Sequence, residues 1–546
     1  MTASGAPLPS SETTARRKAA GIVGLAVIAS RLLGLVRELV LAALFGAGKL
    51  YDAYLAAFRI PNLLRDLFAE GALSTAFTTV FTRTWEKDGP PPAWVLANLI
   101  FSAMLFFLGG ITIMGVLDAP LLVQITNPGF HSVPGKFELT VELTRILFPF
   151  ILFVSLAAAV MGILNARHVF GLPASASSVF NIVSVAGGVL FSYLFEPQAD
   201  WLHPHFGDRA LHGLCLGVLL GGVAQLGVQL PGLWKLGYRF EWRLKLGDPK
   251  LKEVWALMWP SVIAGAAVQI NVLVNSVFAS HIDGGQSWLG YSFRLMQLPI
   301  GVFGVSIATA TLPSVARHFA RGDLAAFGAN VRESLRLVWY FTVPSAIGLA
   351  MLARPIISVI YERGRFTPHD TEQVALALEA YALGLAGYAA IKVLVPCFYA
   401  LGEPRTPLRI SLIGIGVNLG MNFALIHLFG RNHAELALTT SVVALVNFVQ
   451  LWVALGRRVD AGTAEEWVPF AAKIGIAAFF CGDTAWAMNH FTASWADGSH
   501  GFPLKALSLG VSIGASAGVY LATTHLLHVD ESREAIAFVR RKFLKK

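Results

Sequence analysis

Charged residues are scarce in this chain. Only 14% of its 546 residues carry a charged side chain, against about a quarter in an average soluble domain. This scarcity excludes an ordinary water-soluble protein, and the 55% of hydrophobic residues points to lipid as the main solvent. Cysteine is also rare, since Cys215, Cys397 and Cys481 lie far apart in apolar segments. Their spacing gives no support for a disulfide framework or a metal site.

Regular alternation of polar and apolar residues is missing as well, which argues against a transmembrane β-barrel, whose strands alternate over about ten residues. The hydrophobic residues form continuous runs of about 20 residues, each long enough to cross a hydrocarbon core about 30 Å thick. We therefore expect an all-α polytopic membrane protein with about 14 transmembrane helices. The predicted spans are residues 20–45, 52–83, 94–117, 139–165, 174–195, 210–236, 252–281, 288–313, 330–354, 374–402, 407–429, 433–457, 466–490 and 503–527.

The loops between these spans differ in charge. Lys and Arg cluster in residues 16–18, 235–252, 317–321, 457–458 and 540–546, and few occur in the intervening loops. By the positive-inside rule the clusters mark the cytoplasmic side, so both termini are expected in the cytoplasm. This topology and the anionic lipid headgroups explain the net charge of +9. No nucleic-acid partner is expected.

A weak internal repeat relates the two halves of the chain. The segment that starts at Ala57 resembles the segment that starts at Ser292, with a shift of 235 positions (294 minus 59) that aligns Arg59 with Arg294. A shift of about six spans preserves orientation, so the copies are expected to be parallel repeats. We predict two six-helix lobes related by pseudo-two-fold symmetry, plus two C-terminal helices. The predicted domains are a cytoplasmic leader (1–19), an N-terminal lobe (20–236), a C-terminal lobe (252–457), a helix pair (466–527) and a basic cytoplasmic tail (528–546).

Ionisable residues inside the spans are the candidate functional residues. At the centre of a span each costs about 2.5–3.5 kcal/mol on insertion scales, so it normally faces a partner or a hydrated cavity. Four of them, Arg31, Arg37, Arg65 and Arg294, are predicted to bind an anion. Guanidinium suits this task because it stays charged and its planar fork matches phosphate oxygens.

The other ionisable residues of the second span are expected to hold the arginines in place or to form a gate. They are Asp52, Arg59, Asp66 and Glu70. The alternative explanation is that oppositely charged side chains on one helix face neutralise each other. Arg31 and Glu38 lie seven residues apart, as do Asp52, Arg59 and Asp66, and residues at this spacing share a helix face.

Two prolines in the candidate spans are predicted hinges. Pro61 lies between Arg59 and Arg65, and Pro299 occupies a similar place in the eighth span. Proline removes a helix hydrogen bond and kinks the helix. Asn418 and Asn422 lie one turn apart in the eleventh span and could supply oxygens to a cation, although packing asparagines are favoured because no carboxylate lies nearby.

Several runs resemble the MurJ (MviN) lipid II flippase family of the multidrug/oligosaccharidyl-lipid/polysaccharide exporter superfamily. They are SRLLGLVRE, FGAG, YDAY, FRIPNLLRDLFAEGALS and SFRLMQLPIGVFGVSIATATLPS. Arg31, Arg37, Arg65 and Arg294 match arginines that the family requires, and Asp52 and Glu70 match its acidic positions. The chain departs from several relatives at Asp66, where they have a second arginine, and at Phe293, where some have an acid.

The resemblance implies a fold, a substrate and a location. The lobes would surround a cationic cavity, and residues 466–527 would form a groove for a polyprenyl tail. The substrate would be undecaprenyl-pyrophosphate carrying the disaccharide pentapeptide, moved to the outer leaflet of the bacterial inner membrane for peptidoglycan assembly. No metal, cofactor or enzymatic activity is implied, cell-wall synthesis proteins are the expected protein partners, and a monomer is expected to function.

Three functions remain to be compared. A flippase would work by alternating access, with the membrane potential favouring outward movement of an anion. A cation-coupled multidrug exporter of the same superfamily would need intramembrane carboxylates, whereas the balance here is basic. A membrane-embedded polymerase would need a catalytic acid near a sizeable external loop, and the longest such loop, around residues 118–138, offers little of that chemistry.

Overall fold

The structure is a computed structural model that describes residues 29–67, 73–197, 199, 206–430, 432–492 and 502–533. Helices make up nearly all of these residues, and no strand occurs among them. The all-α prediction is therefore confirmed for the described part of the chain. The predicted leader (1–19) and most of the predicted tail (528–546) lie outside it.

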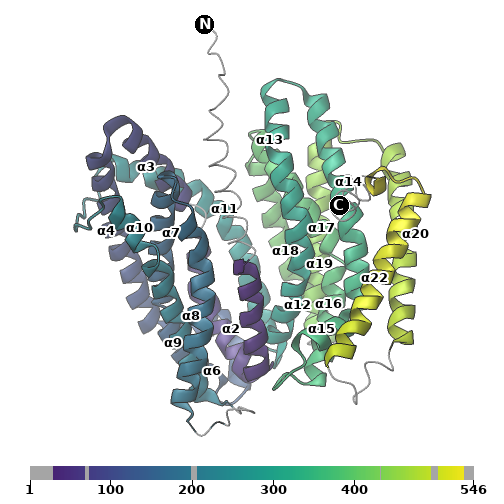
Figure 1. Cartoon of the computed structure of the whole chain (residues 1–546), viewed down its shortest axis with the longest axis horizontal. Helices are drawn as coiled ribbons and strands as arrows, with labels where there is room; N and C mark the ends of the chain where they lie inside the picture. The colour runs from purple at the N-terminus through teal and green to yellow at the C-terminus, as the bar shows by residue number, and fades with distance from the viewer. Residues whose placement is uncertain are drawn as a thin grey trace, which may run out of the picture. The chain divides into compact units, whose positions relative to one another are not determined.

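The chain forms two compact units, Met1–Asp283 (unit 1) and Gly284–Lys546 (unit 2). Most of their helices are labelled in Figure 1. Unit 1 contains a helix over residues 29–45, α2 (Lys49–Arg65), α3 (Ser74–Asp88), α4 (Pro90–Leu117), α5 (Ala119–Thr126), the 3₁₀-helix η2 (Pro128–Ser132), α6 (Lys136–Leu147), α7 (Phe150–Ala166), α8 (Gly171–Phe195), α9 (Asp208–Gly227), α10 (Leu230–Lys235) and α11 (Pro249–Ala279). Unit 2 contains α12 (Gly285–Pro299), the π-helix η3 (Ile300–Val305), α13 (Ser306–Ala320), α14 (Leu324–Met351), α15 (Ala353–Tyr361), α16 (Pro368–Ala382), α17 (Leu385–Ala400), α18 (Arg405–Phe429), α19 (His433–Gly456), α20 (Ala464–Phe491) and α22 (Phe502–Leu526).

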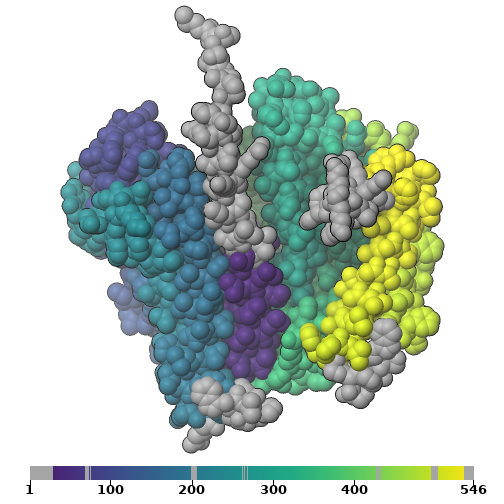
Figure 2. Space-filling view, viewed as in Figure 1, coloured from purple at the N-terminus to yellow at the C-terminus, as the bar shows by residue number. Residues whose placement is uncertain are grey.

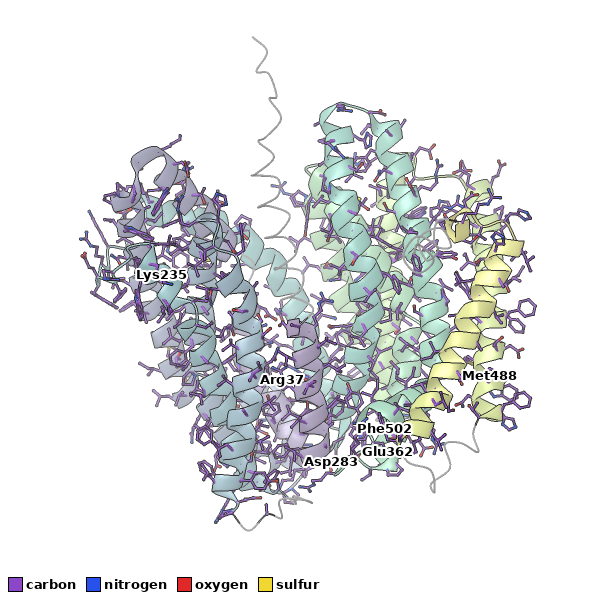
Figure 3. The ribbon with its side chains drawn as sticks, viewed as in Figure 1. Arg37, Lys235, Asp283, Glu362, Met488 and Phe502 are labelled. Carbon is purple, nitrogen blue, oxygen red and sulfur yellow. The ribbon has the colours of Figure 1, made fainter. Side chains whose placement is uncertain are left out.

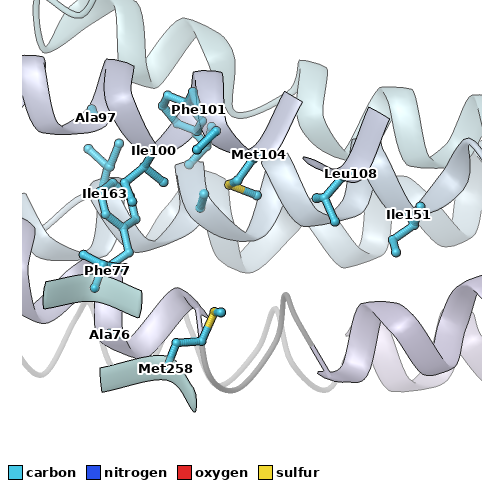
Figure 4. Close-up of a cluster of buried hydrophobic side chains, with 14 of the residues drawn as sticks. Ala76, Phe77, Ala97, Ile100, Phe101, Met104, Leu108, Ile151, Ile163 and Met258 are labelled. Carbon is cyan, nitrogen blue, oxygen red and sulfur yellow. The ribbon is translucent and has the colours of Figure 1, made fainter. Parts of the chain in front are cut away.

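The main core of unit 1 lies where α3, α4 and α7 pack together. Phe77 of α3, Phe101 of α4 and Ile163 of α7 are buried in one cluster, which Met258 of α11 joins (Figure 4). Burial of these large apolar side chains fixes which face of α3 points inward. The opposite side of α3 carries threonines that do not pack into this core.

Two ion pairs join α3 to α11. Arg83 pairs with Glu253, and Lys250 Nζ lies 2.7 Å from Asp88 Oδ2. The hydrogen bond from Lys250 lowers the pKa of the Asp88 carboxyl at the end of α3. These contacts attach α11 to unit 1. The predicted C-terminal lobe begins at residue 252, which lies within α11. The lobe boundaries stay a prediction.

The core of unit 2 is built mainly from α14, α17 and α19. Val331 and Leu335 of α14, Val393 and Leu394 of α17 and Leu451 of α19 are buried together. The buried apolar face of each helix points into this core. This core supports the α20 helix, which packs against α14.

The last helix, α22, packs along α20 through a row of small and aromatic residues. Ser512, Ser516 and Tyr520 recur every fourth residue and are buried, and the Tyr520 hydroxyl donates a 2.7 Å hydrogen bond to the Tyr340 carbonyl of α14. Other faces of α22, the yellow helix in Figure 2, carry the exposed Leu507 and Ile513. An exposed apolar surface of this kind suits contact with lipid.

The observed helices agree in part with the predicted spans. Among the described residues, ten helical segments are long and apolar enough to cross a membrane, and α16 with α17 forms one more as a pair bent by 48°. The predicted span 52–83 is divided between α2 and α3. The predicted external loop 118–138 is largely helical, because α5 and η2 occupy it.

π-helical backbone follows both predicted hinge prolines. Pro61 lies inside α2, and residues 66, 67 and 73 are π-helical. Pro299 ends α12, and η3 follows it directly. Proline disturbs the regular helical hydrogen bonds, and π-bulges occur frequently at functional sites. The hinge role itself stays a prediction.

The contact between α8 and α9 depends on glycine. In α9, a Cβ added to Gly217 would lie 2.1 Å from the backbone nitrogen of Gly188 in α8. Small residues permit such close approach between membrane helices. The α8 and α9 helices therefore run side by side with their backbones in near contact (Figure 1).

We expect Gly217→Leu to destabilise the protein by about 1–3 kcal/mol or more, because the added side chain must push α8 and α9 apart. Thermal unfolding in detergent measures the effect. Gly110→Leu in α4 is the matched control, since no atom lies within 4 Å of a Cβ added there. Equal melting temperatures for the two variants would contradict this account.

Candidate functional site

Arg37 is a largely buried arginine of the first helix (Figure 3). Its side chain is 15% exposed, and its Nη2 donates a 3.3 Å hydrogen bond to Oε1 of Glu38. The guanidinium carbon lies 5.6 Å from the ring centre of Phe180 in α8. Glu38 also accepts a 3.2 Å hydrogen bond from the Tyr51 hydroxyl. Arg37 therefore shares its carboxylate partner with a second donor.

One donor of Arg37 is unsatisfied. Its Nε is buried and has no hydrogen-bond partner in the described part of the chain. Leaving a buried donor unpaired costs about 1–3 kcal/mol, and more for a charged group. The cavity that Arg37 lines measures about 10 Å³, which is room for about one water molecule. Water could therefore satisfy the Nε in this conformation, and a larger anion could do so only after the surrounding helices move apart. Arg37 is thus the predicted anion-binding arginine with the clearest structural need for a ligand.

Asp52 belongs to a buried ion-pair cluster. Its Oδ2 lies 2.7 Å from Lys136 Nζ, and both side chains are completely buried. The same ammonium lies 2.8 Å from Oδ1 of Asp283 and 4.6 Å from the ring centre of Phe130. Asp283 is labelled in Figure 3. One cation thus ties α2 and α6 to the turn after α11. Asp283 is the last residue of unit 1.

Lys136 is a residue that the sequence interpretation missed. In the sequence it is one of the few basic residues of the loops opposite the predicted cytoplasmic side. The structure places it in the first turn of α6 and buries it against Asp52. No local sequence signal reveals this pairing, since the two residues lie 84 positions apart.

Arg59 joins a polar network that also includes residues of α11 and the segment 118–138. Its Nη1 donates a 2.7 Å hydrogen bond to the Ser276 hydroxyl, which donates at 3.0 Å to Oδ1 of Asn127. Asn127 follows α5 directly. Residues 118–138 thus supply Asn127 and Lys136 to the networks around α2.

Arg65 is bound by its neighbour. Its Nη2 and Nε lie 2.8 and 3.2 Å from Oδ1 of Asp66, and the Gln269 amide donates a 3.4 Å hydrogen bond to the other oxygen of that carboxylate. The Arg65 side chain is 21% exposed. Asp66 thus orients Arg65 and neutralises part of its charge.

The remaining predicted site residues are distributed over the chain. Arg31 is exposed and makes no ion pair with any described residue. Arg294 is also exposed but lies on α12 of unit 2. Glu70 lies outside the described residues. Unit 1 therefore holds three of the four predicted anion-binding arginines, and unit 2 holds the fourth.

The local-pairing alternative is wrong for Arg31 and Glu38. Glu38 is held by Arg37 and Tyr51 instead. Seven residues of helix rise about 10 Å, which is too far for an easy contact between two side chains. Asp52 and Asp66 likewise have Lys136 and Arg65 as partners.

Asn418 and Asn422 form a buried pair in α18. The Asn422 amide donates a 2.6 Å hydrogen bond to Oδ1 of Asn418, and both side chains are fully buried. This contact agrees with the packing role favoured by the sequence.

Comparison with known proteins gives a consistent result. The sequence profile of the family described as "Lipid II flippase MurJ" matches residues 41–505. The chain is 33% identical over 486 residues to the lipid II flippase MurJ of Burkholderia cenocepacia, covering 88% of this chain and 91% of that protein. It is 33% identical over 519 residues to the probable lipid II flippase MurJ of Vibrio cholerae, covering 93% of this chain and 95% of that one.

Solved structures show the same fold. A structure titled "Lipid II flippase MurJ, inward closed conformation" matches with a TM-score of 0.75 and 23% identity, covering 94% of this chain and 99% of that chain. An inward-facing multidrug resistance MATE family transporter of the MOP superfamily matches with a TM-score of 0.66 and 14% identity. The match covers 79% of this chain and 95% of that chain.

The buried pair of Lys136 and Asp52 predicts a specific pattern of stability. Lys136→Met should lower the free energy of unfolding by about 3–5 kcal/mol, because it leaves a buried carboxylate without its cation. The double variant Lys136→Met/Asp52→Asn removes both charges and should recover most of that loss. Thermal unfolding in detergent, followed by tryptophan fluorescence, measures both. A single variant as stable as the original protein would refute the buried pair.

Proposed function

Because the chain belongs to the lipid II flippase MurJ family, we propose that it moves lipid II from the inner to the outer leaflet of the bacterial cytoplasmic membrane. Lipid II is the undecaprenyl-pyrophosphate-linked peptidoglycan precursor. The profile match over residues 41–505 and the full-length similarity to lipid II flippases support this function. On this proposal the chain is a multi-pass transporter of the inner membrane and not an enzyme. It works as a monomer, and its partners are lipid II and membrane lipids.

We propose that 14 helical spans cross the membrane. Eleven meet the criteria of length and hydropathy when α16 and α17 are taken as one. Three further helical segments lie where spans are predicted: residues 29–45, the pair of α2 and α3, and α11. Eleven plus three gives the predicted number. An even number agrees with two cytoplasmic termini.

The π-helical segments support two parallel repeats. Adding 235 to the π-helical positions 66 and 67 gives 301 and 302, which fall inside η3 (Ile300–Val305), whereas position 73 gives 308, which lies in α13. The same shift takes Pro61 to position 296, three residues before Pro299. Paired interruptions at corresponding positions of two repeats are typical of transporters. We therefore retain Pro61 and Pro299 as proposed hinges, residues 20–236 and 252–457 as the proposed lobes, and residues 466–527 as the proposed groove for the isoprenoid tail.

Arg37 is the observation that carries the proposed substrate site. A buried guanidinium with one unsatisfied N–H, set in an apolar helix, suits an anion with several acceptor oxygens. A diphosphate is such an anion. Arg31, Arg65 and Arg294 are proposed to bind it as well, while Asp52, Arg59, Asp66 and Glu70 position these arginines or form a gate.

We propose alternating access as the mechanism. The two units would expose the site first to the cytoplasm and then to the outside, while the isoprenoid tail stays in lipid. With the outside positive, the membrane potential favours outward movement of an anion by about 2.3 kcal/mol per charge per 100 mV. The same potential favours inward return of unoccupied arginines.

Substitution of Arg37 tests the site. Arg37→Ala should reduce the amount of lipid II exposed on the outer leaflet at least about tenfold, since it removes charge-assisted hydrogen bonds worth about 1.5–3 kcal/mol. Arg37→Lys should be intermediate, because lysine keeps the charge but loses the fork. The measurement is outer-leaflet accessibility of lipid II in cells depleted of the original protein.

Arg145→Ala is the matched control. Arg145 is an exposed arginine of α6 whose Nε donates to the Val116 carbonyl, and its loss should leave transport unchanged. Normal transport by a well-expressed Arg37→Ala variant would remove Arg37 from the substrate site.

A further inference from the structure

A hydroxyl-lined pocket lies between α3 and α7 in unit 1. Its volume is about 590 Å³, and its walls are Thr75, Thr78, Thr79, Thr82 and Arg83 of α3 with Gly162 and Asn165 of α7. Ligand pockets commonly measure about 300–1,000 Å³. All the lining residues that the structure describes belong to unit 1, so this part of the pocket lies within one compact part of the chain.

The threonines form one face of α3. The spacing 75, 78, 79 and 82 follows the helical period, so these side chains share a side of the helix. Phe77, Val80 and Phe81 point the other way and are completely buried in the core of unit 1. Packing of the core therefore does not account for four threonines on the opposite side.

The chemistry of this face is polar but nearly neutral. The Thr79 hydroxyl donates a 2.8 Å hydrogen bond to the Thr75 carbonyl, whereas no described protein group bonds the hydroxyls of Thr75, Thr78 or Thr82. Arg83 is paired with Glu253 of α11. The pocket thus offers several groups that both donate and accept hydrogen bonds, the Asn165 amide among them, and little net charge.

Resting on the proposed function, we infer that this pocket binds the carbohydrate part of the precursor head. Sugar hydroxyls and N-acetyl amides need partners that both donate and accept, which threonine and asparagine supply. A diphosphate would instead require unpaired cations or converging N–H groups, and the single arginine here already has a carboxylate partner. The pocket is therefore a carbohydrate subsite, separate in chemistry from the arginines that hold the diphosphate.

A comparison of two ligands tests the subsite. Full-length protein in nanodiscs would be titrated with lipid II and with undecaprenyl diphosphate, which lacks the sugars and the peptide. Thr75→Val/Thr79→Val/Thr82→Val keeps the shape of each side chain but removes the hydroxyl. We expect this variant to bind lipid II about tenfold more weakly or worse, because several hydrogen bonds are lost, and to bind undecaprenyl diphosphate as the original protein does.

Two controls keep the test decisive. Thr84→Val changes a buried threonine of the same helix that does not line the pocket, and it should leave both affinities unchanged. Asn165→Ala changes the exposed amide on the α7 wall and should weaken lipid II binding alone, which provides a test if the triple variant does not fold.

The two proposals fail in different ways. Undiminished lipid II binding by folded pocket variants, or an equal loss for both ligands, would overturn the carbohydrate subsite while leaving transport intact. If the original protein neither binds lipid II nor exposes it on the outer leaflet, the proposed function itself is wrong.

Discussion

The cost of placing a charge in a medium of low polarity governs the polar interior of unit 1. A buried ion is stable only when a counter-ion and hydrogen bonds replace its water. Lys136 between Asp52 and Asp283 meets this condition, as does Arg65 beside Asp66. The Lys136 cluster joins α2 and α6 to the turn after α11, and the Gln269 amide of α11 donates a hydrogen bond to Asp66 at the end of α2. Polar contacts thus hold these segments together as well as apolar packing. The Nε atoms of Arg37 and Arg167 depart from this rule, because each is buried and has no acceptor within the described residues.

Fold class and candidate charges could be predicted because each depends on local patterns. Long apolar runs predict helices, and an arginine inside such a run is conspicuous in the sequence. The partners could not be predicted, because they come from distant segments. Lys136 meets Asp52 across 84 positions, and Arg59 meets Ser276 across 217. Sequence spacing also overestimated ion pairing within the first helix, where Arg31 and Glu38 share a face but form no ion pair.

Interruptions of the helices were only partly predictable. Pro61 and Pro299 mark where regular helix is disturbed, but their sequence positions do not reveal that π-helical residues follow both prolines. The folding of residues 118–138 into α5 and η2 was also missed. Short helices of this kind span too few turns for a clear periodic signal, and tertiary contacts decide their conformation.

The pairing of arginines with neighbouring carboxylates has a consequence for transport. A transporter must release its substrate, so binding that is too strong would stop the cycle. Glu38 and Asp66 lie within 3.3 Å of Arg37 and Arg65 and compete for the same N–H groups that a diphosphate would use. On the proposed binding mode, each carboxylate would weaken diphosphate binding and would pair with its arginine again on release, which would limit the energy needed to empty the site. Hydrogen bonds to neutral sugar groups are individually weak, so the proposed recognition of the carbohydrate would add selectivity without trapping the substrate.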